Sequence, residues 1–262
     1  MKKLVTILSL MFGFILFIFS PINGQTVEEL IAQGDDFSTK KFDNEKALEK
    51  FIEADKLSPN NWEILWRLSR SYVDISEHMP SSSDAQKDAQ LVKYQMAYDY
   101  ASKAVSLAPD KSITYLRRAI ANGRIALFKG VFSVIGIVND VKKDLEKAIK
   151  LGNGGSEVQA SSYYVLARTH SKVCEKPYLV RLPLGLGWGD MDESFKNFKK
   201  AIELRPNFRM YYLDAGKAYI QDKEYSKAKE VLAKIPSLPV LDEDDAQFLA
   251  ESKKLLEEIK NK

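Results

Sequence analysis

Cysteine and histidine are scarce in this chain of 262 residues, which contains one cysteine and two histidines. The single cysteine, Cys174, cannot form an internal disulfide, and it lies too far from the N-terminal apolar run to belong to a lipid-attachment motif. We expect it to be a small buried hydrophobic residue on a helix. His78 and His170 have no Cys, Asp or Glu at metal-ligand spacing, so the sequence predicts no metal site.

The chain also lacks a strong excess of either charge. It carries 39 basic and 36 acidic residues, a net charge of +3. Removal of residues 1–24, which contain Lys2 and Lys3 and no acid, would leave 37 basic residues against 36 acidic ones, a net charge of +1. A nucleic-acid-binding domain normally shows a clear basic excess, so we expect no nucleic-acid partner.

Catalytic motifs are missing as well. The glycine run Gly185–Gly189 is followed by no Lys-Ser/Thr pair and preceded by no strand pattern, so it does not indicate a phosphate-binding loop. We expect Asp190 to cap the next helix and Trp188 to hold the loop against the fold. There is no serine elbow and no Cys/His nucleophile arrangement. The sequence therefore predicts a protein that is not an enzyme, with no catalytic residues and no cofactor.

One long apolar run is present, and it lies at the N-terminus. Two lysines precede residues 4–19, and the run ends before Pro21 and Gly24. This arrangement is typical of a secretory signal peptide, so we expect residues 1–24 to be removed and residues 25–262 to reside in the periplasm or cell envelope. The alternative is an uncleaved N-terminal membrane anchor, because the run approaches the roughly 20 residues that span a bilayer. Membrane contact is expected only in that case.

The chain is rich in one recurring spacing. Four positions recur at fixed intervals in Ala47–Pro59, Ala97–Pro109 and Ser194–Pro206: a small residue, a phenylalanine or alanine, an alanine and a proline. A partner pattern recurs in Leu65–Tyr72, Tyr163–His170 and Tyr212–Tyr219. Residues three and four apart share one face of a helix, so each pattern forms a ridge on one of two paired helices. Small residues let the helices approach closely, and proline ends the second helix. The patterns resemble the tetratricopeptide repeat, or TPR.

The fold class that this predicts is all-α: a TPR-like solenoid of about five helix pairs over residues 25–262, closed by a C-terminal capping helix that begins near Asp242–Asp245. Two insertions, 73–94 and 176–190, interrupt the regular period. We expect Asp84 to cap the helix that follows the first insertion. The apolar, glycine-flanked segment 130–138 is expected to form a buried elbow, with an exposed apolar contact as the alternative.

Three features are also similar to the regulator of microtubule dynamics family over roughly residues 27–260. They are the segment Trp62–Tyr72, the long insertion after it, and a compact last repeat followed by a helix with an acidic start. Members of that family are TPR-type adaptors, some of them tethered to membranes. The resemblance therefore implies an adaptor architecture. Together with the predicted leader, it does not lead us to expect a cytoskeletal role.

A binding face is predicted by cations that recur at one repeat position. Arg70, Arg168 and Lys217 each follow the small residue of a first helix, and Trp66, Tyr164 and Leu213 stand four places before them. Equivalent positions of first helices line the concave face of a TPR stack, where cations beside aromatic rings could hold an extended acidic segment. The alternative is that these cations are simply solvated. The asparagines of carboxylate-clamp TPR proteins are absent, so recognition of a free C-terminus is not expected.

We therefore expect an exported, non-catalytic scaffold that binds a protein or peptide of acidic character in its concave groove. The alternative function is binding of an apolar small molecule or lipid in a pocket formed by the 131–138 strip and the 178–188 loop.

Overall fold

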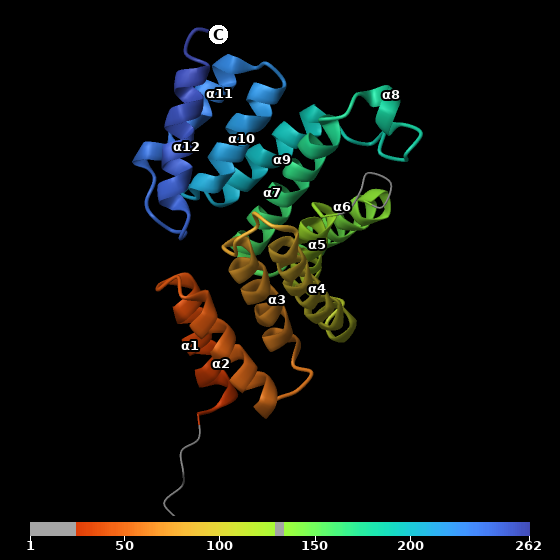
Figure 1. The fold of residues 1–262 in the computed structure, drawn as a ribbon, viewed down its shortest axis with the longest axis vertical. Coiled ribbons are helices and arrows are strands. Elements are labelled where there is room, and N and C mark those ends of the chain that lie inside the picture. Colours follow the sequence, from red (N-terminus) through yellow and green to blue (C-terminus); the bar gives the residue numbers. More distant parts are fainter. Residues whose placement is uncertain (1–24, 129–133) are drawn as a thin grey trace, which may run out of the picture.

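The computed structural model describes residues 25–128 and 134–262, and over these residues the chain forms twelve α-helices, one 3-10 turn and no strand (Figure 1). The helices are α1 (Val27–Thr39), α2 (Asn44–Leu57), α3 (Trp62–Glu77), α4 (Asp84–Leu107), α5 (Ser112–Ala126), α6 (Val134–Leu151), α7 (Gly155–Cys174), α8 (Tyr178–Arg181), α9 (Met191–Leu204), α10 (Arg209–Gln221), α11 (Tyr225–Leu232) and α12 (Asp245–Glu258), with the 3-10 turn at Ile235–Ser237. Two segments lie outside the described residues: the predicted leader, 1–24, and residues 129–133, which include the start of the apolar strip.

The helices pack as five antiparallel pairs: α1 with α2, α3 with α4, α5 with α6, α7 with α9, and α10 with α11. Helix α12 then packs on α10 and α11. The prediction of about five pairs and a capping helix is confirmed.

Proline ends the second helix of a pair in the same way three times. The C-cap residues of α2, α4 and α9 are Ser58, Ala108 and Arg205, and their φ angles are −136°, −137° and −141°. Each of these residues precedes a proline, which disfavours the helical conformation in the residue before it. The predicted helix ends are therefore confirmed in geometry as well as in position.

The helix starts follow the predicted capping chemistry with one exception. Asp190 caps α9, because its carboxylate accepts a hydrogen bond of 2.9 Å from the backbone N–H of Glu193. The expectation that Asp84 caps α4 is wrong. Ser83 is the capping residue, because its hydroxyl and the side chain of Gln86 satisfy each other's backbone N–H groups in a capping box.

The small residues of the repeat lie where paired helices touch. Ala54, Ala104 and Ala201 are fully buried. At Gly216 a β-carbon would lie 2.5 Å from the side chain of Leu232 on α11, so only glycine fits this crossing without displacing that leucine. The close approach predicted from the repeat is therefore confirmed.

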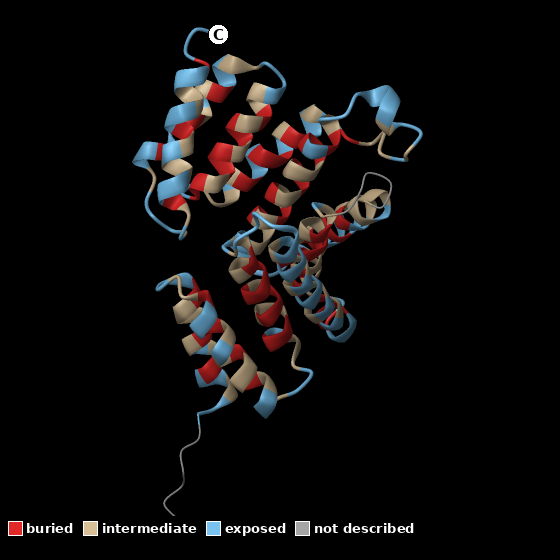
Figure 2. Ribbon diagram, viewed as in Figure 1, coloured by how far each residue is buried: buried red, intermediate tan, exposed pale blue. Residues whose placement is uncertain are grey.

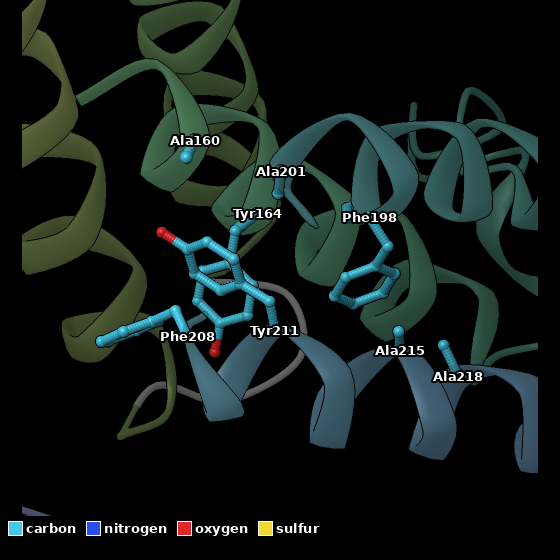
Figure 3. Packing of buried hydrophobic residues seen from close by; sticks show 9 residues of the cluster. Ala160, Tyr164, Phe198, Ala201, Phe208, Tyr211, Ala215 and Ala218 are labelled. Carbon is cyan, nitrogen blue, oxygen red and sulfur yellow. The ribbon is translucent and has the colours of Figure 1, made fainter. Parts of the chain in front are cut away.

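The hydrophobic core is divided among neighbouring pairs. In Figure 2 the buried positions form stripes along the helices where pairs meet. One such cluster joins α7, α9 and α10 (Figure 3). There the ring of Tyr164 stacks on the ring of Tyr211, with 4.7 Å between the ring centres, and it meets the ring of Phe198 edge-on, with 6.1 Å between the ring centres. Such a core, shared from neighbour to neighbour, is the expected organisation of a solenoid.

The apolar strip does not form the predicted elbow within its described part. Residues 134–138 form the first turn of α6, where Ile137 packs on the core and Gly136 is exposed. An unbroken run of apolar residues can also form the half-buried start of a helix. The flanking glycines led the sequence analysis to interpret this segment as a loop instead. None of the helices in the described part of the chain is long and apolar enough to cross a membrane.

The second insertion protrudes beside α7 and carries the short helix α8, whose Leu179 is 82% exposed. Trp188 holds the far end of this insertion, as predicted: its indole N–H donates a 2.8 Å hydrogen bond to Asn139 of α6. The same ring lies edge-on to His170, at 5.2 Å. His170 is buried and accepts a hydrogen bond from the backbone N–H of Asp190, which agrees with its predicted structural role. Cys174, expected to be buried, is half-buried at the end of α7.

Candidate functional site: the central cavity

The inner side of the helical array lines an open cavity of 1360 Å³. Its main walls are the first helices of three successive pairs, α3, α5 and α7, and each of them contributes residues to the lining on successive turns. On α3 these residues are Trp66, Arg70, Asp74 and Glu77, a spacing that keeps them on one helix face. This is the concave side on which the repeat pattern predicts binding.

The cavity is bounded by contacts between the two ends of the repeat array. The amide of Asn44, at the start of α2, donates a 2.8 Å hydrogen bond to Glu243 in the loop before α12. At the end of α3, a ring nitrogen of His78 lies 3.2 Å from a carboxylate oxygen of Asp244. Burial lowers the pKa of His78, but hydrogen bonds with the Asp74 carbonyl and the Asp244 carboxylate, and the nearby Glu243, raise it overall to about 9.

Four of the six predicted groove residues line this cavity: Trp66, Arg70, Tyr164 and Arg168. The prediction is wrong for Leu213, which is 1% exposed and packs among Tyr212, Leu232 and Ile259. Lys217 is not part of the cavity lining either, because α12 covers this face of α10 and its Glu251 forms an ion pair of 2.9 Å with Lys217. The capping helix thus occupies the surface that α10 would otherwise add to the groove.

The predicted cations are neutralised within the fold. Arg70 forms an ion pair of 3.2 Å with Asp74, one turn later on α3. Arg168 reaches Asp214 of α10 at 3.1 Å. Basic and acidic side chains line the cavity in nearly equal number, so it is a mixed surface and not a uniformly basic groove.

Asp74 and Asp214 are site residues that the sequence analysis missed. Asp74 could have been found as an acid four places after Arg70, a spacing that pairs charges on a helix. Asp214 of α10 also accepts a 2.7 Å hydrogen bond from the hydroxyl of Tyr164 of α7, so this bond joins two neighbouring helix pairs. Burial raises the pKa of the Tyr164 phenol well above its usual range, so this hydroxyl remains a neutral donor.

Another part of the cavity wall is apolar. It includes Val134, Val138 and Val141 of α6 together with residues of α5 and α7. The insertion that follows α7 adds Val180, Leu184 and Leu186, and its Arg181 donates hydrogen bonds to the carbonyls of residues 186, 187 and 189. A loop whose carbonyl groups surround a cation is unsuited to phosphate, which agrees with the sequence interpretation of the glycine run.

The paired helices and the concave cavity between them define a helical-repeat protein of the TPR class. A thermophilic TPR protein of Thermus thermophilus superposes with a TM-score of 0.66 at 13% identity, over 88% of this chain and 99% of that one. Pseudomonas aeruginosa pilF superposes with a TM-score of 0.54 at 11% identity, over 90% and 85% of the two chains. At these identities the likeness concerns the fold alone.

Residues 30–260 match the family described as regulator of microtubule dynamics protein 1-3, and the chain belongs to this family. Regulator of microtubule dynamics protein 1 of Mus musculus is 27% identical over 88% of this chain and 74% of its own length. Regulator of microtubule dynamics protein 2 of the same species is 25% identical over 89% of this chain but 56% of its own length, so the chain spans about half of that relative. The family resemblance inferred from the sequence is confirmed.

Proposed function

We propose that this protein is a non-catalytic interaction scaffold that holds an extended segment of another protein in its central cavity. The observation that supports the proposal is the cavity itself: 1360 Å³ on the concave side of a TPR-like array, with walls that combine apolar patches and hydrogen-bonded charges. An extended peptide needs both kinds of wall, because its backbone and side chains differ in polarity. The charge balance of the lining favours a segment of mixed polarity over a strongly acidic one.

Two helical glycines provide a matched test of this site. Gly123 of α5 lines the cavity, whereas Gly136 of α6 is exposed and is not part of the lining. A β-carbon at either position would meet no neighbouring atom within 4 Å. Gly123→Trp should therefore fill the cavity without disturbing the helix packing, and Gly136→Trp should add the same ring on the outside.

The measurement is cross-linked capture of partners from the native cells, compared among the wild type and the two variants. We expect Gly123→Trp to lose the captured proteins and Gly136→Trp to retain them, with both variants melting at or above the wild-type temperature. Capture that is unchanged by the tryptophan at position 123 would show that partners bind elsewhere.

A second candidate function is binding of an apolar small molecule or lipid. It is favoured by the apolar lining residues of α6 and of the 180–186 segment, which include part of the strip and loop that the sequence analysis assigned to such a pocket. Solvent extraction of the purified protein followed by mass spectrometry tests it. A stoichiometric lipid in the wild type that is absent from Gly123→Trp would favour this function over the scaffold.

We further propose that residues 1–24 direct export and are then removed, which rests on the sequence pattern alone. Intact-mass measurement of the protein from its native cells tests this. A mass that begins at Gln25 is expected, and a full-length mass would favour the membrane anchor.

A further inference from the structure

Two consecutive arginines of α5 differ sharply in their surroundings. Arg118 points away from the cavity and makes two hydrogen bonds with the carboxylate of Asp144, at 2.7 and 2.6 Å. Arg117 lines the cavity. Within residues 25–128 and 134–262, it makes no ion pair and no hydrogen bond, and its Nε is buried without a partner. The residues outside these ranges contain neither Asp nor Glu that could neutralise it.

The other arginines of the cavity lining all have partners in the described structure. Arg70, Arg124, Arg168 and Arg205 form ion pairs with Asp74, Glu77, Asp214 and Glu157, and Arg181 binds backbone carbonyls. Arg117 therefore contributes one positive charge that the described fold leaves uncompensated. Arg117 is half-buried, and an unpaired charge that is partly withdrawn from water is costly unless a partner neutralises it.

Trp66 is a neighbour of Arg117 in the cavity wall. The Arg117 guanidinium lies 5.6 Å from the centre of the Trp66 ring, and the guanidinium of Arg67 lies 4.2 Å from the same centre. Arg67 is itself neutralised by Asp35. Burial and the positive charge of nearby Arg70 lower the pKa of Arg117 to about 10, so it remains protonated at neutral pH.

We propose that Arg117 binds the carboxylate of an Asp or Glu side chain in the protein segment held by the cavity. The planar end of a guanidinium matches the two oxygens of a carboxylate, and with Nε buried the two terminal nitrogens are the donors left for it. This inference rests on the proposed function and adds to it one required acidic residue in an otherwise mixed segment.

Charge balance favours a carboxylate over a phosphate monoester. A single negative charge neutralises Arg117. A phosphate monoester carries nearly two negative charges at neutral pH. Its second charge would find no free arginine in the described lining, because the other arginines are already paired or hydrogen-bonded.

The test is selection of random twelve-residue peptides displayed on phage. Wild-type protein should select peptides that share one Asp or Glu at a fixed position, and Gly123→Trp should not bind them. Replacing that acid by its amide should weaken binding to the wild type at least about tenfold, as expected for loss of a charged hydrogen bond. The same replacement should have no effect on binding to Arg117→Gln, because the two changes remove the same interaction.

Arg118→Gln is the matched control, and it should bind the acidic peptides as the wild type does. If melting shows that Arg118→Gln is unfolded, the acidic and amide peptides compared on the wild type and on Arg117→Gln still decide the question. Peptides selected without a shared acid, or bound equally by Arg117→Gln, would overturn the role of Arg117 and leave the scaffold intact. Selection of no cavity-dependent peptide would overturn both proposals. Binding of phosphatidic acid vesicles, but not phosphatidylcholine vesicles, that is lost in Arg117→Gln would assign the site to a phosphate and contradict a carboxylate.

Discussion

The regular repeats and the irregular segments of this molecule divide the construction of the cavity between them. Helices α3, α5 and α7 occupy equivalent places in successive pairs, and they form its main walls. The loop before α12, the start of α6 and the insertion after α7 do not follow the repeat, and they add further residues to the cavity lining. The repeat therefore supplies the main walls, whereas the irregular segments supply contacts that the repeat pattern does not specify.

This division implies different sensitivities to mutation. Repeat positions lie between helices in contact, where volume is fixed by packing. The irregular segments are more exposed and are held by a few polar contacts, such as those of Asn44 and His78. Substitutions in the repeat should change the stability of the fold. Substitutions in the irregular segments should change the contacts between the two ends of the array, or binding in the cavity.

The largest stability difference is expected between two positions of α9. Ala201 is fully buried at the contact with α7, while Lys199 is exposed. Ala201→Trp should destabilise the protein by about 3 kcal/mol because of overpacking, whereas Lys199→Trp should change its stability by less than about 0.5 kcal/mol. Urea unfolding measures both, and equal midpoints would contradict the assigned helix contact.

Two glycines in first helices should respond to alanine with opposite signs. Gly216→Ala should destabilise the protein by about 2 kcal/mol, because the new methyl group would meet buried Leu232. Gly123→Ala should stabilise it by about 0.5 to 1 kcal/mol, because alanine is the better helix former and space is open there. Thermal unfolding of both variants checks the pair, and destabilisation by the alanine at 123 would mean that the space beside this position is not open.

A smaller, pH-dependent effect on stability is expected where His78 contacts Asp244 in the loop before α12. The folded-state pKa of His78 is raised to about 9, from an unfolded value near 6.5. Its contribution to stability is therefore complete below about pH 6.5 and is lost as the pH rises through 9. Because the side chain is 43% exposed, solvent screening should keep this contribution below about 1 kcal/mol.

The measurement is the stability difference between the wild type and His78→Gln, followed from pH 6 to 10. The difference should shrink across this range as the charge of His78 is lost. A difference that does not change with pH would mean that His78 makes no charged contact with the loop before α12.

The smallest effect is expected in the second insertion. Leu179 is 82% exposed, so Leu179→Ser should alter the free energy of unfolding by less than about 0.5 kcal/mol. A larger loss in denaturant unfolding would show that α8 is packed more tightly against the solenoid than its exposure indicates.

The sequence predicted the helices that form the cavity walls well, but it did not predict the contacts between segments far apart in the chain. The reason is physical. Proline and small residues act locally, so helix ends at Pro59, Pro109 and Pro206 and the crossing at Gly216 could be predicted from spacing. Leu213 is buried among residues of α11, the 3-10 turn and the end of α12, all of which come later in the chain. Likewise, Arg117 differs from Arg118 through partners on other helices, which spacing within α5 cannot reveal.

The most direct test of the central claim is site-specific photo-cross-linking in the native cells. A benzophenone side chain at Ile120 would lie in the cavity lining, and the same group at Val92 would lie on an exposed part of α4 outside that lining. We predict that partner proteins cross-link at position 120 and not at position 92. Cross-linking at position 92 with none at position 120 would contradict binding in the central cavity.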